Sequence, residues 1–152
     1  MQHIRLVPAD EALAEQTAAY YCRNRIFLQE FEPVREEEFF SVPCQQKLLR
    51  EEALEFREKT AFRSAFLGYK LDERFLNRGY MTEAVGMLVR YAFEDLHLHR
   101  IEANVMPKNK ASLRVLEKNC FINEGYSRHY LKINGVWEDH IHMVKLNEAM
   151  HI

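Results

Sequence analysis

Few residues in this sequence could form covalent or metal crosslinks, because 152 residues include only three cysteines: Cys22, Cys44 and Cys120. An odd number of widely separated cysteines argues against a disulfide framework and against a structural zinc site. Four histidines also lack the spacing of metal ligands, so we predict no metal site; they are His97, His99, His140 and His142. We expect His97 and His99 to end a helix, where positive charge is favoured.

Long runs of apolar residues are also missing. A membrane-spanning helix needs about 20 predominantly apolar residues, and a secretory signal needs an apolar stretch close to the N-terminus. Residues 1–5 begin no such stretch, and no later segment reaches the length of a span. We therefore expect a cytoplasmic protein with no membrane partner.

An excess of charge of one sign is lacking as well. The sequence has 21 Lys and Arg against 23 Asp and Glu, which gives a net charge of -2. Nucleic-acid binding requires clustered positive charge, so we predict no nucleic-acid partner. Because repeats, linkers and low-complexity segments are absent and 47% of the residues are hydrophobic, residues 1–152 are predicted to form a single domain.

The hydrophobic and turn patterns predict one mixed α/β fold of alternating strands and helices. Asp10 and Asn109 can cap helices, and Asn134-Gly135 is a strong hairpin signal because both residues tolerate positive φ. The predicted strands cover residues 4–8, 65–71, 101–105, 128–133 and 136–146. The predicted helices cover residues 11–23, 44–59, 80–96 and 111–118.

The loop between the strand at 65–71 and the helix starting at Tyr80 is suited to an anion. Asn77 and Gly79 tolerate positive φ, and the backbone amides and dipole of a helix N-terminus favour a phosphate. A strand, loop and helix joined by a glycine is also a common structural turn. The residues alone leave both interpretations open.

Several motifs between residues 63 and 146 together resemble the C-terminal half of a GNAT N-acetyltransferase. They are G-Y-K-L-D, N-R-G-Y-M-T-E-A-V, H-R-I-E-A-N-V, P-K-N-K-A-S, V-L-E-K and E-G-Y-S-R-H-Y-L-K-I-N-G-V-W-E-D-H. The last motif, with Trp137, Asp139 and His140, is similar to the RimJ/RimL group of ribosomal-protein alanine acetyltransferases. The resemblance implies a GNAT-like acyl-CoA N-acyltransferase fold and transfer of an acetyl group from acetyl-CoA to an amine.

The resemblance also implies which residues bind acetyl-CoA. The strand at 67–71 would pair through its backbone with the pantetheine arm, and Arg74, Asn77 and Gly79 occupy the three marked positions of the family's pyrophosphate loop. Asn109 resembles a family contact to the pantetheine region, although it could equally be a plain helix cap. The full predicted set is Leu67, Tyr69, Leu71, Arg74, Asn77, Arg78, Gly79, Tyr80, Met81, Asn109 and Ser112.

Direct acetyl transfer requires a neutral amine, an oxyanion donor and a proton for the leaving thiolate. Glu102, on the strand beside the expected cleft, is the candidate base; its alternatives are an exposed strand residue and an ion-pair partner of a nearby arginine. Ser112 is the first candidate for the acid and Tyr126 the second. The structural alternatives are that Ser112 is simply a residue in the first turn of a helix and that Tyr126 is an aromatic residue of the core. A strand amide near Leu71 could be the oxyanion donor. No Ser-His-Asp or Cys-His arrangement is required, because the amine attacks directly.

The acceptor is predicted to be a protein N-terminus, such as that of a ribosomal protein. A small-molecule amine is the rival acceptor, and a degenerate, non-catalytic CoA-binding module is the rival class. The acidic and aromatic residues 30–40 lie where the family places its acceptor loop, but a solvated helix face explains most runs of charge and is the alternative here.

Two departures from the family pattern have structural consequences. The family places a two-stranded hairpin between its second helix and the donor-binding strand, and here it is lacking between residues 57 and 65, through natural shortening or omission of a segment. The strand at 65–71 should then lie at an open edge, which is compatible with a homodimer. Cys120 stands where the family has glycine, and Asn119 is expected to take over the left-handed cap.

Overall fold

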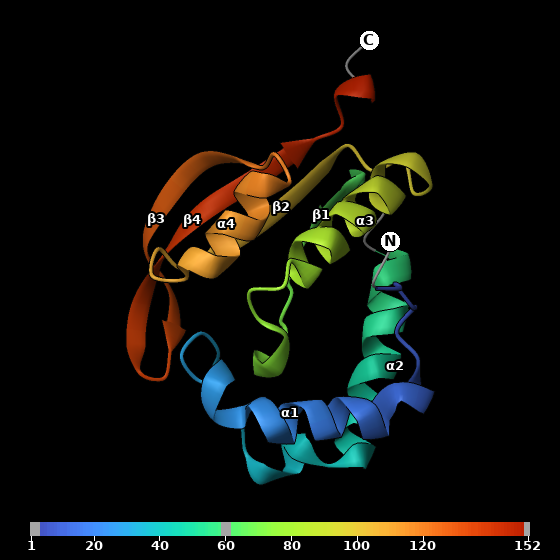
Figure 1. Ribbon diagram of the computed structural model, residues 1–152, viewed down its shortest axis with the longest axis vertical. Coiled ribbons are helices and arrows are strands. Elements are labelled where there is room, and N and C mark those ends of the chain that lie inside the picture. The colour runs from blue at the N-terminus through green and yellow to red at the C-terminus, as the bar shows by residue number, and fades with distance from the viewer. Residues whose placement is uncertain (1–3, 59–61, 151–152) are drawn as a thin grey trace.

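The computed structural model describes residues 4–58 and 62–150. In these two segments, four strands form one mixed sheet in the order β1-β2-β4-β3 (Figure 1). β1 (Ser64–Phe66) pairs in parallel with β2 (Arg100–Val105), and β4 (Val136–Leu146) pairs antiparallel with β2 and with β3 (Ile122–Ile133). The mixed α/β fold predicted from the sequence is confirmed.

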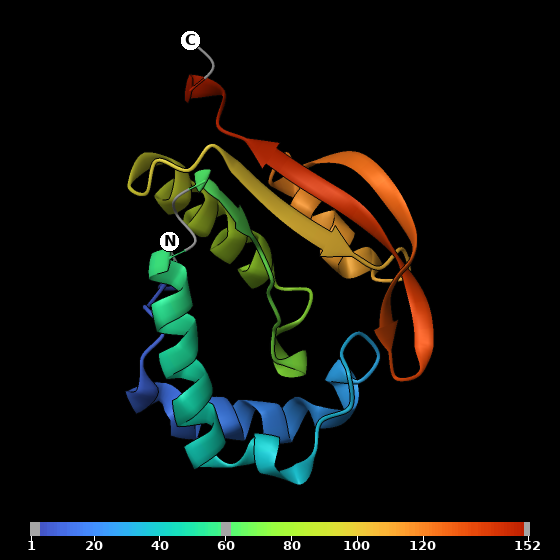
Figure 2. The same cartoon turned by 180° about the vertical axis from the view of Figure 1, so that it is seen from behind.

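The helices divide into two pairs. α3 (Tyr80–Glu94) and α4 (Lys110–Lys118) cover one face of the sheet, whereas α1 (Ala14–Leu28) and α2 (Val42–Glu58) pack against each other to one side of it (Figures 1 and 2). Short 3-10 helices span Glu11–Leu13, Glu37–Phe40, Glu73–Phe75 and Glu148–Met150.

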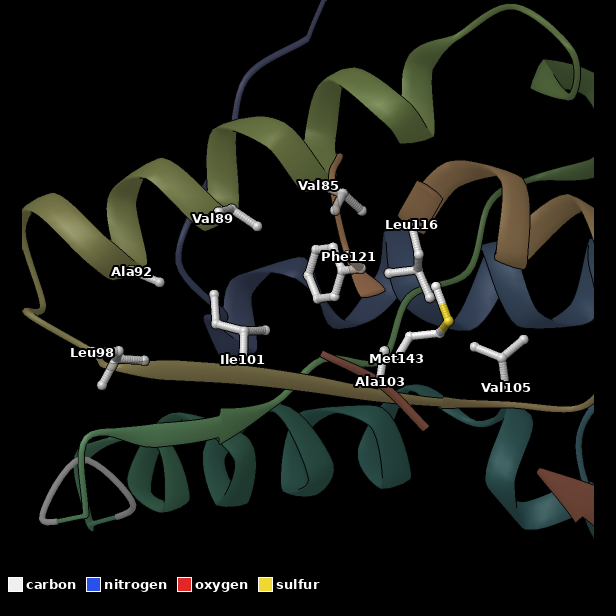
Figure 3. Packing of buried hydrophobic residues seen from close by; sticks show 10 residues of the cluster. All are labelled: Val85, Val89, Ala92, Leu98, Ile101, Ala103, Val105, Leu116, Phe121 and Met143. Atoms are coloured by element: carbon white, nitrogen blue, oxygen red, sulfur yellow. The ribbon is translucent and has the colours of Figure 1, made fainter. Parts of the chain in front are cut away.

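The main core lies between β2 and the helices α3 and α4. Apolar side chains from these elements and from the flanking segments form one buried cluster (Figure 3), namely Val85, Val89, Ala92, Leu98, Ile101, Ala103, Val105, Leu116, Phe121 and Met143. Side chains alternate along a strand, so the remaining β2 residues Arg100, Glu102 and Asn104 point to the opposite face of the sheet. That face is the one on which polar side chains gather.

The helix caps predicted at Asp10 and Asn109 and the turn predicted at Asn134-Gly135 are confirmed. The Asp10 carboxylate accepts a hydrogen bond from the Ala12 amide at 2.8 Å. Asp10 thereby caps the 3-10 helix at Glu11–Leu13, which continues into α1. Asn109 caps α4 in the same way. Asn134 and Gly135 have φ values of 49° and 85°, as the predicted hairpin turn requires.

Two predicted strands are wrong in whole or in part. Residues 4–8 form no strand, and Leu6 and Val7 are 40% and 50% exposed. A strand needs a neighbour with which to pair. Only residues 59–63 separate α2 from β1, which is too few for the hairpin implied by the family resemblance, so residues 4–8 lack that hairpin as a pairing partner. The strand expected at 65–71 ends at Phe66, and β1 lies at the edge of the sheet, as the missing hairpin predicts.

Several helix ends also differ from expectation, and α1 ends at Leu28 instead of Arg23. Cys120 adopts the left-handed conformation, with a φ of 60°, whereas Asn119 has a φ of -94°. Asn119 is held where it is because its amide group donates to Thr82 O and Val115 O, so the strain of about 1 kcal/mol falls on Cys120. α3 ends at Glu94, and therefore His97 and His99 lie beyond the helix instead of ending it.

Neither a membrane span nor a metal cluster is present in the described residues. None of the helices within 4–58 and 62–150 is long and apolar enough to cross a bilayer. Over the same residues, no three or more His, Cys, Asp or Glu side chains converge as metal ligands would.

Candidate active site

The site begins where the sheet opens between β1 and β2. The Leu67 amide donates to the Glu102 carbonyl at 2.7 Å, and beyond this bond residues 67–71 leave the ladder while β2 continues to Val105. An extended ligand can bind backbone groups at such an opening as an added strand would.

The loop that leads from this opening into α3 has the conformation expected of an anion-binding turn. Asn77 and Gly79 have φ values of 59° and 80°, and Gly79 precedes the first turn of α3 with no side-chain cap. A Cβ built on Gly79 would meet nothing within 4 Å, so the positive φ, not crowding, favours glycine here. The loop amides and the positive end of the α3 dipole suit a phosphate.

Asp72 anchors this loop to α1. Its carboxylate accepts hydrogen bonds from the Arg74 side chain at 3.0 Å and from the Arg23 side chain at 2.6 and 2.8 Å. The Arg74 guanidinium, followed by that of Arg23, holds the pKa of Asp72 well below its usual range against the opposing effect of burial. Next to it, the Glu73 amide donates to Asn24, a buried side chain of α1. Arg74, predicted to contact the donor, therefore also fixes the loop.

Ser112 and Tyr69 meet across the opening. The Ser112 hydroxyl donates to the Tyr69 hydroxyl at 2.8 Å, and Tyr69 donates to the Ser112 carbonyl at 2.9 Å. The Asn109 side chain accepts from the Ser112 amide at 3.1 Å, which confirms its capping role. Burial raises the pKa of Tyr69, and the bond from Ser112 opposes this only in part, so the phenol is protonated at neutral pH.

Glu102 lies on the face opposite α3 and α4 and is bound to an arginine. Arg100 Nε donates to its carboxylate at 2.7 Å, and Arg100 Nη2 lies 2.6 Å from Glu124. These bonds, to Glu124 first and to Glu102 second, raise the pKa of Arg100 and keep it cationic. The ion-pair alternative weighed for Glu102 is thus present, and the group of one arginine and two carboxylates keeps one net negative charge.

Tyr126 is not a core aromatic, contrary to one of its two interpretations. Its side chain is 54% exposed, and its hydroxyl donates to Asp139 at 2.5 Å. The bond to Asp139 raises the pKa of Tyr126 and contributes to lowering the pKa of Asp139. In the register of β3 and β4, Tyr126 faces Ile141, on the side of the sheet away from Glu102.

The acidic and aromatic segment around residues 30–40 is tied to the site by two contacts. Lys70 lies 2.6 Å from the Glu32 carboxylate, and the Asn134 side chain at the hairpin tip bonds the backbone of residues 29–34. The sequence alone contains no sign of these contacts, because their partners are far apart in the chain. They hold the predicted acceptor loop against the tip of the β3–β4 hairpin and against the segment that follows β1.

One polar group on this face was missed by the sequence analysis. The Ser127 hydroxyl lies 2.7 Å from His142 Nε2, and His142 Nδ1 lies 2.6 Å from Asn104 Oδ1. Asn104 Nδ2 in turn donates to the Tyr130 hydroxyl at 3.4 Å. Strand register and the irregularity of β3 between Ser127 and Leu131 bring these residues together, and no local sequence pattern indicates their contacts.

A sheet that opens beside a helix N-terminus suited to phosphate defines an acyl-CoA N-acyltransferase fold. Residues 44–122 match the family model of the acetyltransferase (GNAT) domain. The chain is 39% identical over 166 positions to the probable N-acetyltransferase YjcK of Bacillus subtilis, with 92% of each chain covered. The chain therefore belongs to the GNAT acetyltransferase family, the acetyl-CoA-dependent N-acetyltransferases.

Solved structures agree with this assignment. The ribosomal-protein-S5-alanine acetyltransferase of Vibrio fischeri has a TM-score of 0.86 and 29% identity, over 95% of this chain and 92% of that one. RimJ of Mycobacterium smegmatis, in complex with CoA-disulfide, has a TM-score of 0.85 and 24% identity, over 94% of this chain and 81% of that one.

The alignment with YjcK spans 166 positions and is longer than this 152-residue chain, so YjcK contains residues with no counterpart here.

Proposed function

We propose that this protein transfers the acetyl group of acetyl-CoA to the N-terminal α-amine of a protein, such as a ribosomal protein, by direct attack of the amine. The observation that carries the proposal is the opening beyond Leu67, which lies between the loop at Gly79 and the Tyr69–Ser112 pair. Membership of the GNAT family supports acetyl-CoA as the acetyl donor. The likeness to an S5-alanine acetyltransferase supports the acceptor.

The donor lies in this opening. Backbone groups of Leu67, Tyr69 and Leu71 pair with the pantetheine amides as a neighbouring strand would. The amides from Asn77 to Tyr80 hold the pyrophosphate, with the α3 dipole behind them. Asp72 keeps the loop in this shape through its bonds to Arg23 and Arg74.

The chemical step needs two proton transfers and one oxyanion contact. The neutral amine attacks the thioester carbon, and a backbone amide near Leu71 stabilises the oxyanion. As the C–S bond breaks, the thiolate takes a proton from the Ser112 hydroxyl, which its bond to Tyr69 holds in place. The proton that the nitrogen of the tetrahedral adduct loses then restores the Ser112 hydroxyl. The products are the N-acetylated amine and free CoA.

The charges on the open face suit a cationic acceptor. Arg100 with Glu102 and Glu124 leaves one net negative charge, which attracts an ammonium group. An α-amine with a pKa near 8 already has a neutral fraction at pH 7, whereas lysine with a pKa near 10.4 has almost none. The α-amine is therefore the easier acceptor for this site.

A non-catalytic CoA-binding module is the alternative favoured by one observation. Only five residues, 59–63, join α2 to β1, which is too few for the two-stranded hairpin that the family resemblance implies beside the donor-binding strand. Retained donor binding without turnover would favour this alternative. A small-molecule amine remains the rival acceptor within the enzyme class.

Mass spectrometry with three acceptors tests the proposal. A peptide that begins with alanine should gain one acetyl group from acetyl-CoA, and the same peptide with a blocked N-terminus should gain none. Spermidine serves as the small-amine control. Acetylation of spermidine but not of the free peptide would contradict the α-amine assignment, and binding of acetyl-CoA without any acetylation would identify the non-catalytic module.

A further inference from the structure

The polar group on the open sheet face has the geometry of a proton relay. Ser127, His142 and Asn104 come from β3, β4 and β2 and are joined by contacts of 2.7 and 2.6 Å. All three side chains are half-buried. A serine, an imidazole and an amide in this order are arranged so that the hydroxyl can pass its proton to the ring.

The bonding pattern fixes the tautomer of His142. Asn104 Oδ1 can only accept, so His142 Nδ1 must be the donor in the contact between them. The other end of the Asn104 amide donates to the Tyr130 hydroxyl, which is consistent with that orientation. A neutral His142 then presents Nε2 as an acceptor, and the Ser127 hydroxyl donates to it.

The relay lies beside the place where the amine must react. The opening begins at the Leu67–Glu102 bond and continues along Asn104, the next β2 residue on the open face. Asn104 and His142 are direct partners in the β2–β4 register. An acceptor that reaches a thioester in the opening from the open face would pass these side chains.

We infer that Ser127 and His142 remove the proton from the acceptor ammonium; the inference rests on the proposed function. The ammonium gives a proton to Ser127 Oγ, while the Ser127 hydroxyl proton moves to His142 Nε2. The neutral amine attacks, and the imidazolium later releases its proton to solvent. Asn104 is a positioning residue, which holds the ring in the Nδ1-protonated form.

Other titratable and charged groups beside His142 are already engaged. Glu102 and Arg100 on β2 are paired with each other. His140, two residues away on β4, is buried, and its Nδ1 contacts the Glu138 carbonyl at 3.2 Å. The Tyr130 ring packs against both histidines, with ring centroids 5.2 to 5.3 Å apart.

The kinetic test compares kcat/KM between pH 6 and 9.5 for the alanine peptide. His142→Gln and Ser127→Ala should each lower kcat/KM about 100-fold at pH 7 and much less at pH 9.5, where the amine is neutral without help. His140→Gln is the matched control, since it removes the other histidine against Tyr130, and its pH profile should keep the wild-type shape. Wild-type rates at pH 7 for His142→Gln, or equal losses at both pH values, would overturn the inference.

A second measurement does not depend on turnover. Nitrogen-15 NMR of the wild-type protein at pH 8 should show His142 protonated at Nδ1 and not at Nε2. A ring protonated at Nε2 cannot accept from Ser127 and would overturn the inference. If the wild-type protein acetylated no amine, the proposed function would fail, and this measurement alone would decide whether the relay exists.

Discussion

The Ser112 hydroxyl donates to the Tyr69 phenol, which donates back to the Ser112 carbonyl, so one pair of side chains joins α4 to the segment beyond β1. The two residues are 43 positions apart. Their contact closes the α4 side of the opening in which the donor is proposed to bind. It also gives Ser112 one defined rotamer, which a proton donor needs.

Removal of the Ser112 hydroxyl should slow turnover and leave donor binding nearly intact. We expect Ser112→Ala to lower kcat about 10- to 100-fold, because proton donation matters mainly as the thiolate leaves. Calorimetry with acetyl-CoA and steady-state rates with the alanine peptide check this. Tyr126→Phe is the comparison variant: a fully active Ser112→Ala with a slow Tyr126→Phe would assign the acid to Tyr126.

A side chain at Gly79 should weaken donor binding. Gly79→Val places a β-branched residue at a φ of 80° in the loop proposed to hold the pyrophosphate, so we expect a loss of at least about 2 kcal/mol in acetyl-CoA binding. Gly135→Val is the matched control, because Gly135 has a φ of 85° in the hairpin turn. The control should lose stability and keep its donor affinity; equal affinity losses in both variants would contradict a specific role for the loop.

The stabilising effect of Asp72 should disappear in acid. Its pKa is lowered in the folded protein, so its carboxylate contributes fully above the unfolded value of about 3.9, and the contribution is lost as pH falls toward the folded value. The melting temperatures of wild type and Asp72→Asn should therefore differ by a constant amount between pH 5 and 8. They should converge below about pH 4. A difference that stays constant down to pH 2 would mean that the ion pairs with Arg23 and Arg74 do not cause it.

Glu102→Gln should separate charge attraction from proton removal. If the carboxylate mainly attracts the acceptor, the variant should raise KM for the cationic peptide several-fold, and the increase should shrink at high salt. The low-pH part of its kcat profile should match that of the wild type. A loss confined to low pH would instead make Glu102 the base, as the sequence first suggested, and would count against His142.

Local signals explain why much of the fold could be predicted. α3 and α4 carry apolar residues at helical spacing, Asn109 provides a cap, and Asn134-Gly135 dictates its turn from two adjacent residues. The positive φ values of Asn77 and Gly79 follow from their residue types, whereas the predicted donor-binding role of their loop rests on the family resemblance. Each of these features depends on neighbours within a few positions of the chain.

The errors concern features that depend on distant partners. Residues 4–8 have a strand-like composition but no strand to pair with, and Asn119 was already committed to Thr82 on α3. The contact between Asn104 and His142 follows from the β2–β4 register, which no local pattern of either strand encodes. Alternation along each strand could show which residues share a face, but not which of them touch.

Because β1 is short, we expect this edge of the sheet to open locally more readily than the rest. Three residues pair with β2 on one side, and no other strand of the described sheet lies on the other, so little free energy opposes local opening there. We expect the amides of Ala65 and Leu67 to exchange hydrogen with solvent faster than those in the middle of β2 and β4, as exchange measured by NMR would show. Transient detachment of this edge would widen the proposed donor opening while the rest of the sheet stays folded, so entry and release of a large donor would need no global unfolding.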